Sequence, residues 1–92
     1  MTTLEDLLNR IIAQYNRYRS PEATARLLSI NGNIVEVEFE GSFCHTCGVI
    51  DWIEDLSYEA EDLGLKMRLI KVIDKEQDKK VGVFSIEKSN IV

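Results

Sequence analysis

Apolar residues recur at intervals of three and four in two segments, which predicts two amphipathic helices. The first spans residues 3–19, where Thr3 and Asp6 have the spacing of a capping box and Ser20-Pro21 follows the last turn. The second spans residues 49–63 and is followed by Gly64, a common left-handed residue after a helix. We expect both apolar stripes to face the core. The stripe of the first helix is Leu4, Leu7, Leu8, Ile11, Ile12, Tyr15 and Tyr18.

Between the helices, the pattern predicts a hairpin of two strands. Residues 23–30 form the first strand, and Asn31-Gly32 is a dipeptide that suits a tight turn. In the return strand the apolar and acidic residues alternate, so one face should enter the core and the other should carry carboxylates into water. The alternating residues are Val35, Glu36, Val37, Glu38, Phe39 and Glu40.

A second pair of strands is predicted after the second helix. Residues 65–73 alternate and then become continuously apolar, which indicates a strand that is either buried on both faces or bulged midway. Residues 74–80 are charged and predict a turn, and residues 81–86 predict the fourth strand. The order α-β-β-α-β-β therefore predicts a two-layer α+β domain, a small four-stranded sheet with two helices on one face.

The size and charge of the chain limit its functions. With 92 residues, it should form a single domain over 1–92 around one core. A formal net charge of -5 opposes binding to nucleic acid or to anionic membranes. The start of the chain lacks the pattern of a signal peptide, and no segment has the ~20 apolar residues of a membrane span. We therefore expect a cytoplasmic protein. The second helix carries no Lys or Arg, and a solvated acidic face is favoured over docking to a basic partner.

The candidate chemistry lies in residues 41–48, where Cys44 and Cys47 form a Cys-x-x-Cys pair between a strand and a helix. Such a pair can share a metal, a cluster or a disulfide. In a reducing cytoplasm, binding of a metal or cluster and redox chemistry are favoured over a structural disulfide. Zinc and most iron–sulfur clusters need four ligands, so a second copy of the chain would have to complete the site as a homodimer. We expect Phe43 and Gly48 to shape a water-poor pocket and His45 to be an exposed loop residue.

Thiol–disulfide exchange is the rival chemistry, and it requires an accessible thiolate. The start of a helix stabilises a nearby thiolate by about 0.3–1 kcal/mol, or by ~2 kcal/mol when the site is partly buried. This interaction lowers a cysteine pKa by about one unit. The loop holds no Lys or Arg to assist, and Asp51, Glu54 and Asp55 oppose the effect. This balance favours a cofactor ligand. No catalytic acid or base is identifiable, so a non-enzymatic function is favoured while an enzyme stays open.

Residues 27–63 resemble the carboxy-terminal domain of the NifU-like (Nfu) family. The resemblance lies in the hairpin, the Val-Glu-Phe-Glu-Gly strand end and the motif Gly41-Ser42-Phe43-Cys44-His45-Thr46-Cys47, which has one residue more than the family's Gly-x-Cys-x-x-Cys. It implies a scaffold or carrier that binds a [4Fe-4S] cluster between two subunits through Cys44 and Cys47 and passes it to apo iron–sulfur proteins. The alternatives are a zinc-linked dimer, an interaction module without a cofactor whose cysteines are free or form a disulfide, and a thiol–disulfide oxidoreductase.

Overall fold

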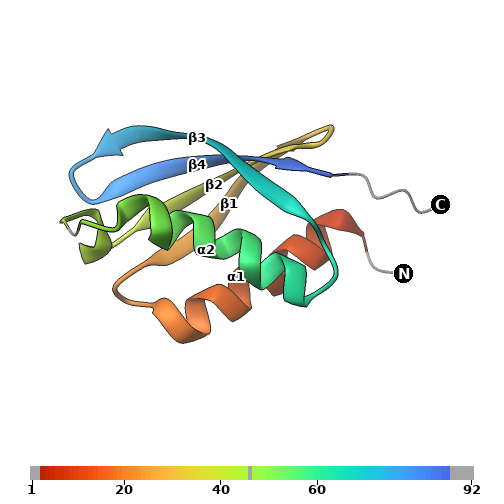
Figure 1. Cartoon of the computed structure of the whole chain (residues 1–92), viewed down its shortest axis with the longest axis horizontal. Helices are drawn as coiled ribbons and strands as arrows, with labels where there is room; N and C mark the ends of the chain where they lie inside the picture. The colour runs from red at the N-terminus through yellow and green to blue at the C-terminus, as the bar shows by residue number, and fades with distance from the viewer. Residues whose placement is uncertain (1–2, 46, 88–92) are drawn as a thin grey trace.

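The computed structural model of the chain describes residues 3–45 and 47–87 and shows two layers (Figure 1). The order is α-β-β-α-β-β, as predicted, with a short 3-10 helix before the second α-helix. Four antiparallel strands form one sheet in the order β1-β2-β4-β3. The elements are α1 (Leu4–Arg19), β1 (Thr24–Asn31), β2 (Ile34–Glu40), η1 (Ser42–His45), α2 (Val49–Asp62), β3 (Met67–Glu76) and β4 (Lys79–Ile86).

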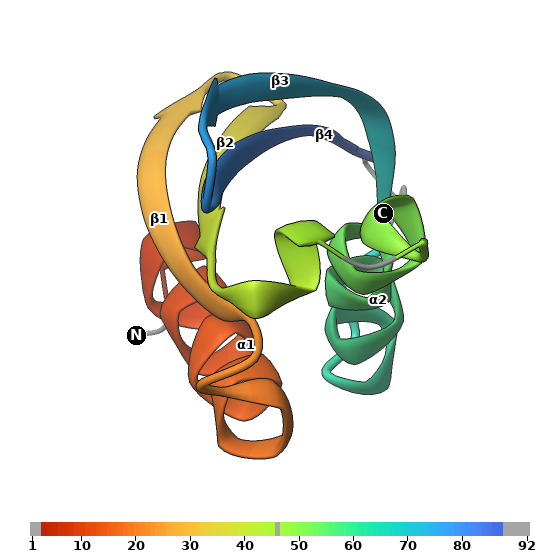
Figure 2. The same cartoon turned by 90° about the vertical axis from the view of Figure 1, so that its left-hand side faces the viewer.

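Both helices lie on one face of the sheet, and the sheet arches over them (Figures 1 and 2). The predicted capping box begins α1: the backbone N–H of Asp6 donates to Thr3 Oγ1 at 3.1 Å, and Thr3 N–H donates to Asp6 Oδ2 at 3.4 Å. Among the described residues, no helix is both long and apolar enough to span a membrane. Tyr18 departs from the predicted stripe. Tyr18 is 69% exposed, and its ring lies beside the guanidinium group of Arg17 rather than in the core.

The return strand β2 follows the prediction. Val35, Val37 and Phe39 are fully buried, whereas the alternating glutamates lie on the other face. Phe39 is central to the core because its ring lies 5.5 Å from that of Tyr15, 6.4 Å from that of Phe43 and 6.3 Å from that of Phe84. The core therefore joins α1, the sheet and η1 in one cluster.

Strand β3 corrects part of the prediction. It is not buried on both faces, since Met67 is its single buried residue. The bulged alternative is confirmed, with register shifts between Leu69 and Lys71 and again between Asp74 and Glu76. The expected turn over 74–80 is also too long. Both strands extend into it, and Gln77-Asp78 alone make the turn. The charges that suggested a turn are tolerated because β3 is an edge strand whose side chains reach water.

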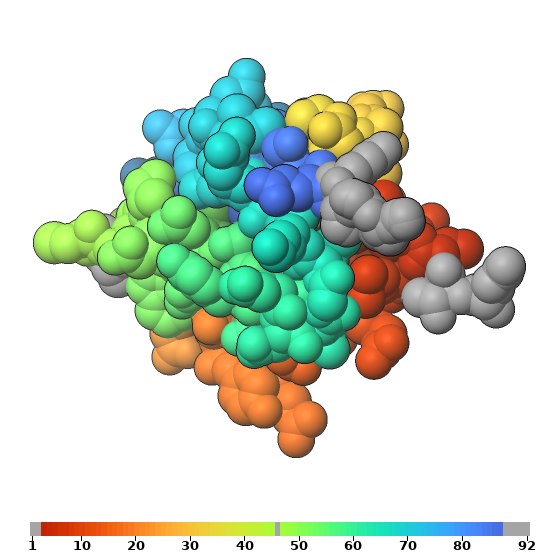
Figure 3. All heavy atoms as spheres, turned by 45° about the vertical axis from the view of Figure 1, so that its right-hand side comes forward, coloured from red at the N-terminus to blue at the C-terminus, as the bar shows by residue number. Residues whose placement is uncertain are grey.

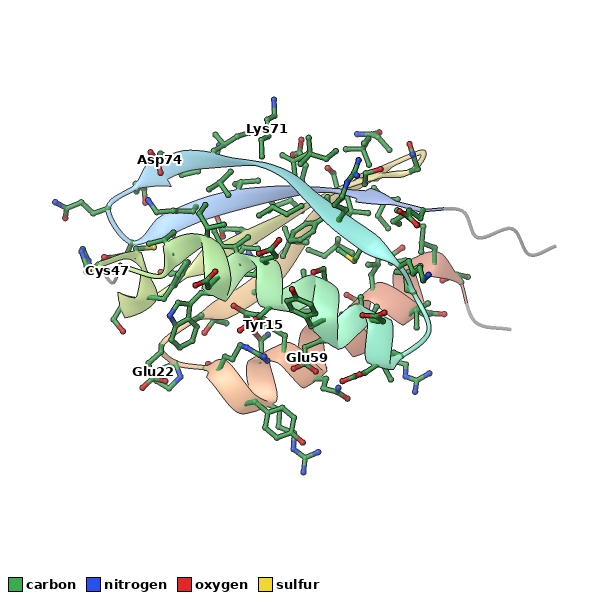
Figure 4. The ribbon with its side chains drawn as sticks, in the orientation of Figure 1. Tyr15, Glu22, Cys47, Glu59, Lys71 and Asp74 are labelled. Carbon is green, nitrogen blue, oxygen red and sulfur yellow. The ribbon has the colours of Figure 1, made fainter. Side chains whose placement is uncertain are left out.

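Polar contacts fix the two helices to each other. The Tyr15 hydroxyl donates to the Trp52 carbonyl at 2.6 Å, and Figure 4 shows Tyr15 and Glu59 between α1 and α2. Glu59 accepts hydrogen bonds from Gln14 at 2.7 Å and from Arg19 at 2.8 Å. Burial alone would raise the pKa of the Glu59 carboxyl, but these two hydrogen bonds lower it below its usual value. These contacts with α1 fix the position of α2, and therefore of the loop that precedes it.

Candidate functional site

The two cysteines lie at one end of the molecule. Cys44 belongs to η1, and Cys47 precedes the first turn of α2, which has Gly48 as its N-cap. Figure 3 shows this region of the chain, in yellow-green, projecting at the end of the molecule, and Figure 4 places Cys47 there. Thr46, which completes the motif, lies outside the described residues. The strand-to-helix position of the pair agrees with the prediction, whereas the intervening 3-10 turn was not foreseen.

Gly41 allows the chain to turn from β2 into this loop. Its φ angle is 143°, a conformation that side chains disfavour. A Cβ atom here would overlap the backbone carbonyl oxygen of Glu22 and would lie 2.8 Å from the carbonyl oxygen of Pro21. The neighbouring Phe43 N–H donates to the same Glu22 oxygen at 3.0 Å. The loop is therefore held directly against the segment that links α1 to β1.

Phe43 anchors the loop from inside. Its side chain is fully buried, and its ring lies 6.4 Å from that of Phe39 and 6.1 Å from that of Trp52. The expected water-poor pocket shaped by Phe43 and Gly48 is therefore wrong in this form: Phe43 belongs to the core. Gly48 instead borders a shallow cavity of about 270 Å³ beside Arg19 and Trp52. Phe43 fixes the backbone of Cys44, its neighbour in the chain.

Both cysteines are free thiols, and they differ in exposure. Cys44 is half-buried and Cys47 is exposed. Burial raises the pKa of the Cys44 thiol, as do the carboxylates of Asp78 and Asp74, while Lys80 and a backbone hydrogen bond with Gly41 act in the opposite direction. The sequence suggested that acids of α2 would control this pKa. The charges that do so come from β3, β4 and the turn between them, which the fold brings to the loop.

His45 is exposed, as expected, and it faces the β3–β4 turn. Its Nε2 lies 2.7 Å from Asp78 Oδ1, and both side chains are about 60% exposed, at 61% and 60%. In the same turn, the Asp78 carbonyl accepts a hydrogen bond from Gly41 N–H at 3.0 Å. Within residues 3–45 and 47–87, no group of three or more His, Cys, Asp or Glu side chains is placed to hold a metal ion. A metal bound by Cys44 and Cys47 would therefore need further ligands from outside these residues.

The acidic face of α2 is partly neutralised by a residue that sequence reasoning did not connect with it. Arg19 of α1 lies 3.5 Å from Asp55 and 2.8 Å from Glu59. Asp51, Glu61 and Asp62 remain exposed on the same helix. Part of the acidic helix thus serves the contact between the helices, and the rest is a solvated surface, of which Asp51 lies at the end of α2 next to the cysteine loop.

Comparison with known proteins identifies no relative. No family model matches the chain, and no curated protein or solved structure matches it. The likeness to NifU-like domains rests on the motif residues of the sequence and on their place between β2 and α2.

Proposed function

We propose that this protein carries an iron–sulfur cluster, which two copies of the chain hold between them through Cys44 and Cys47 of each copy. The observation that carries the proposal is the pair of free thiols, Cys47 exposed and Cys44 half-buried, on a loop at the end of the molecule. A [4Fe-4S] cluster is commonly held by four cysteine sulfurs, so two copies supply the required number. A two-fold axis near the loop would bring the second pair to the first.

The environment of Cys44 favours a ligand over a nucleophile. A thiol–disulfide enzyme needs a cysteine pKa below the usual value, and that of Cys44 is raised. Iron binding does not need a preformed thiolate, because the charge of the metal displaces the proton. Cluster binding should therefore release protons and weaken as the pH falls. The raised pKa of Cys44 weighs against the oxidoreductase alternative.

The exposure of the loop suits a cargo that is passed on. Cys47 is exposed in the single chain, so the cysteines of an acceptor could approach it directly. Exchange of ligands between accessible thiolates is the simplest route by which a cluster leaves a carrier. The acceptors would be apo iron–sulfur proteins with unoccupied cysteines. A reducing cytoplasm, where thiols persist, is the compartment that this function requires.

Anaerobic reconstitution with ferrous iron and sulfide tests the proposal. We expect a brown protein with about four iron atoms per two chains, and a sedimenting mass that doubles when the cluster is taken up. Cys44→Ser and Cys47→Ser should each abolish the colour. His45→Ala is the matched control, since His45 lies in the same loop and receives no ligand role, and it should retain the cluster.

Three outcomes would reject the proposal. A complete cluster on a single chain would show that the ligand set lies within one copy. Retention of the colour in either serine variant would remove that cysteine from the ligand set. Stoichiometric zinc in the purified protein, with no uptake of iron, would identify the zinc-linked dimer instead.

A further inference from the structure

The sheet has a bare face opposite the helices (Figures 1 and 2). Val81 and Val83 of β4 lie on it. They are 2% and 5% exposed, yet they do not belong to the core cluster that the helices cover. The strand register explains this position, because Val83 lies opposite Glu36 of β2 on one side and opposite Lys71 of β3 on the other. The valines are therefore screened by their neighbours on the outer face.

The charges on this outer face are separated by strand. Glu36 and Glu38 of β2 lie on one side of β4, and Lys71 of β3 lies on the other. Figure 4 shows the Lys71 side chain pointing away from the helices. Glu38 pairs with Arg26 at 2.8 Å. Across the described part of the chain, neither Glu36 nor Lys71 takes part in an ion pair. Each therefore has its charge available to a partner.

We propose that a second copy of the chain packs on this face, related by a two-fold axis that runs parallel to β4. Such a rotation exchanges the two sides of the sheet while it keeps positions along the strand. Glu36 of one copy then lies over Lys71 of the other, and the reverse pair forms by symmetry on the other side of β4. Strand β4 of one copy lies along β4 of the other between these pairs. An in-plane axis perpendicular to the strands would instead bring Lys71 onto Lys71, so the order of charges selects the parallel axis.

The size of the face sets the strength of the contact. Eight residues at about 3.3 Å each and four strands about 4.8 Å apart give a face of roughly 400–500 Å². Stable dimers bury about 800 Å² per partner. The face is also convex, because the sheet arches over the helices (Figure 2), so contact centres on β4, with β2 of one copy over β3 of the other. We therefore expect a reversible dimer that forms at micromolar or higher concentration and weakens with salt.

This contact does not rest on the proposed function. Cys44 and Cys47 belong to the loop at the end of the molecule, on the side of the helices, and they remain accessible when the bare faces meet. Where both interactions occur, a cluster would join two sheet-face dimers. The metal-free protein would already be dimeric.

Sedimentation equilibrium of the full chain with reduced cysteines, at low and high salt, tests this inference. We expect Glu36→Lys and Lys71→Glu each to weaken dimerisation by roughly 10- to 30-fold, because each converts two attractive contacts per dimer into repulsive ones. The double variant Glu36→Lys/Lys71→Glu exchanges the two charges and should restore affinity to within about 3-fold of the original.

Two controls make the result specific. Glu61→Lys introduces the same charge change on the exposed part of α2 and should leave dimerisation unchanged. Cys44→Ser/Cys47→Ser should also dimerise normally, which separates this contact from the cysteine-linked one. Circular dichroism checks that each variant is folded. A monomer at all concentrations, dimerisation that is unaffected by the single variants, or a double variant as weak as the singles would each overturn the inference.

Discussion

Replacement of Gly41 by alanine should destabilise the protein more than alanine at any exposed glycine. The φ angle of 143° at Gly41 lies in a region open almost only to glycine, and occupying it with a side chain costs about 1–3 kcal/mol. The new methyl group would also overlap the Glu22 carbonyl oxygen and lie 2.7 Å from its carbon. These are backbone atoms, so no side-chain rotation relieves the contact.

The displaced loop would lose a further interaction. Moving Gly41 away from Glu22 breaks the hydrogen bond from Phe43 N–H to the Glu22 oxygen, at 3.0 Å, which is worth about 0.5–1.5 kcal/mol. The two effects together predict a loss of about 1.5–4.5 kcal/mol in the free energy of unfolding. For a domain of this size, that corresponds to a fall in melting temperature of roughly 5–35 °C.

Urea unfolding followed by the fluorescence of Trp52 provides the measurement, since it is the only tryptophan and its ring lies 6.1 Å from that of Phe43. Gly32→Ala is the matched control. Gly32 also has a positive φ angle, 61°, but nothing lies within 4 Å of the position of its Cβ, so the expected loss is only about 1–2 kcal/mol. If Gly41→Ala costs no more than Gly32→Ala, the close approach of the loop to Glu22 does not constrain the protein as argued.

Three further outcomes are expected. Gly82→Ala should lower the free energy of unfolding by about 1–3 kcal/mol through overpacking, measured in urea, because its methyl group would lie 2.9 Å from two core side-chain carbons; an unchanged value would contradict this. The lowered pKa of Glu59 means that its contribution to stability is present above the unfolded-state pKa of about 4.3 and is lost as the pH falls through the lower folded value. Glu59→Gln should therefore show a smaller loss of stability between neutral and acidic pH than the original protein, and equal losses would refute the role of its bond with Arg19. Iodoacetamide at neutral pH should modify Cys47 before Cys44, since Cys44 is half-buried and has a raised pKa. Mass spectrometry of partly labelled protein measures the order, and modification of Cys44 first would contradict this expectation.

The sequence alone was sufficient for the elements that have strong periodicity. The capping box at Thr3 and the alternation through Val35, Val37 and Phe39 depend on local spacing, and local spacing is visible in a sequence. The end of β3 was not predictable in the same way. Its charged residues suggest a turn, but an edge strand accepts them because one of its sides is open to water.

The site was only partly predictable. The motif located Cys44 and Cys47 between a strand and a helix, and the structure places both there. The contacts that control the loop were hidden because they join residues far apart in the chain. Asp78 approaches His45 from the β3–β4 turn, and Glu22 approaches Gly41 from the α1–β1 link. Gly41 itself was the one local signal available, since a glycine directly after a strand and before a cysteine motif suggests a constrained turn.

The contacts of Asp78 with the cysteine loop have a consequence for biosynthesis. The main-chain carbonyl of Asp78 holds Gly41, and its carboxylate holds His45, although these partners are translated more than thirty residues earlier. A nascent chain that has emerged only as far as α2 lacks the turn that clamps the loop. The Cys44 and Cys47 thiols therefore reach their final setting only after the last hairpin leaves the ribosome.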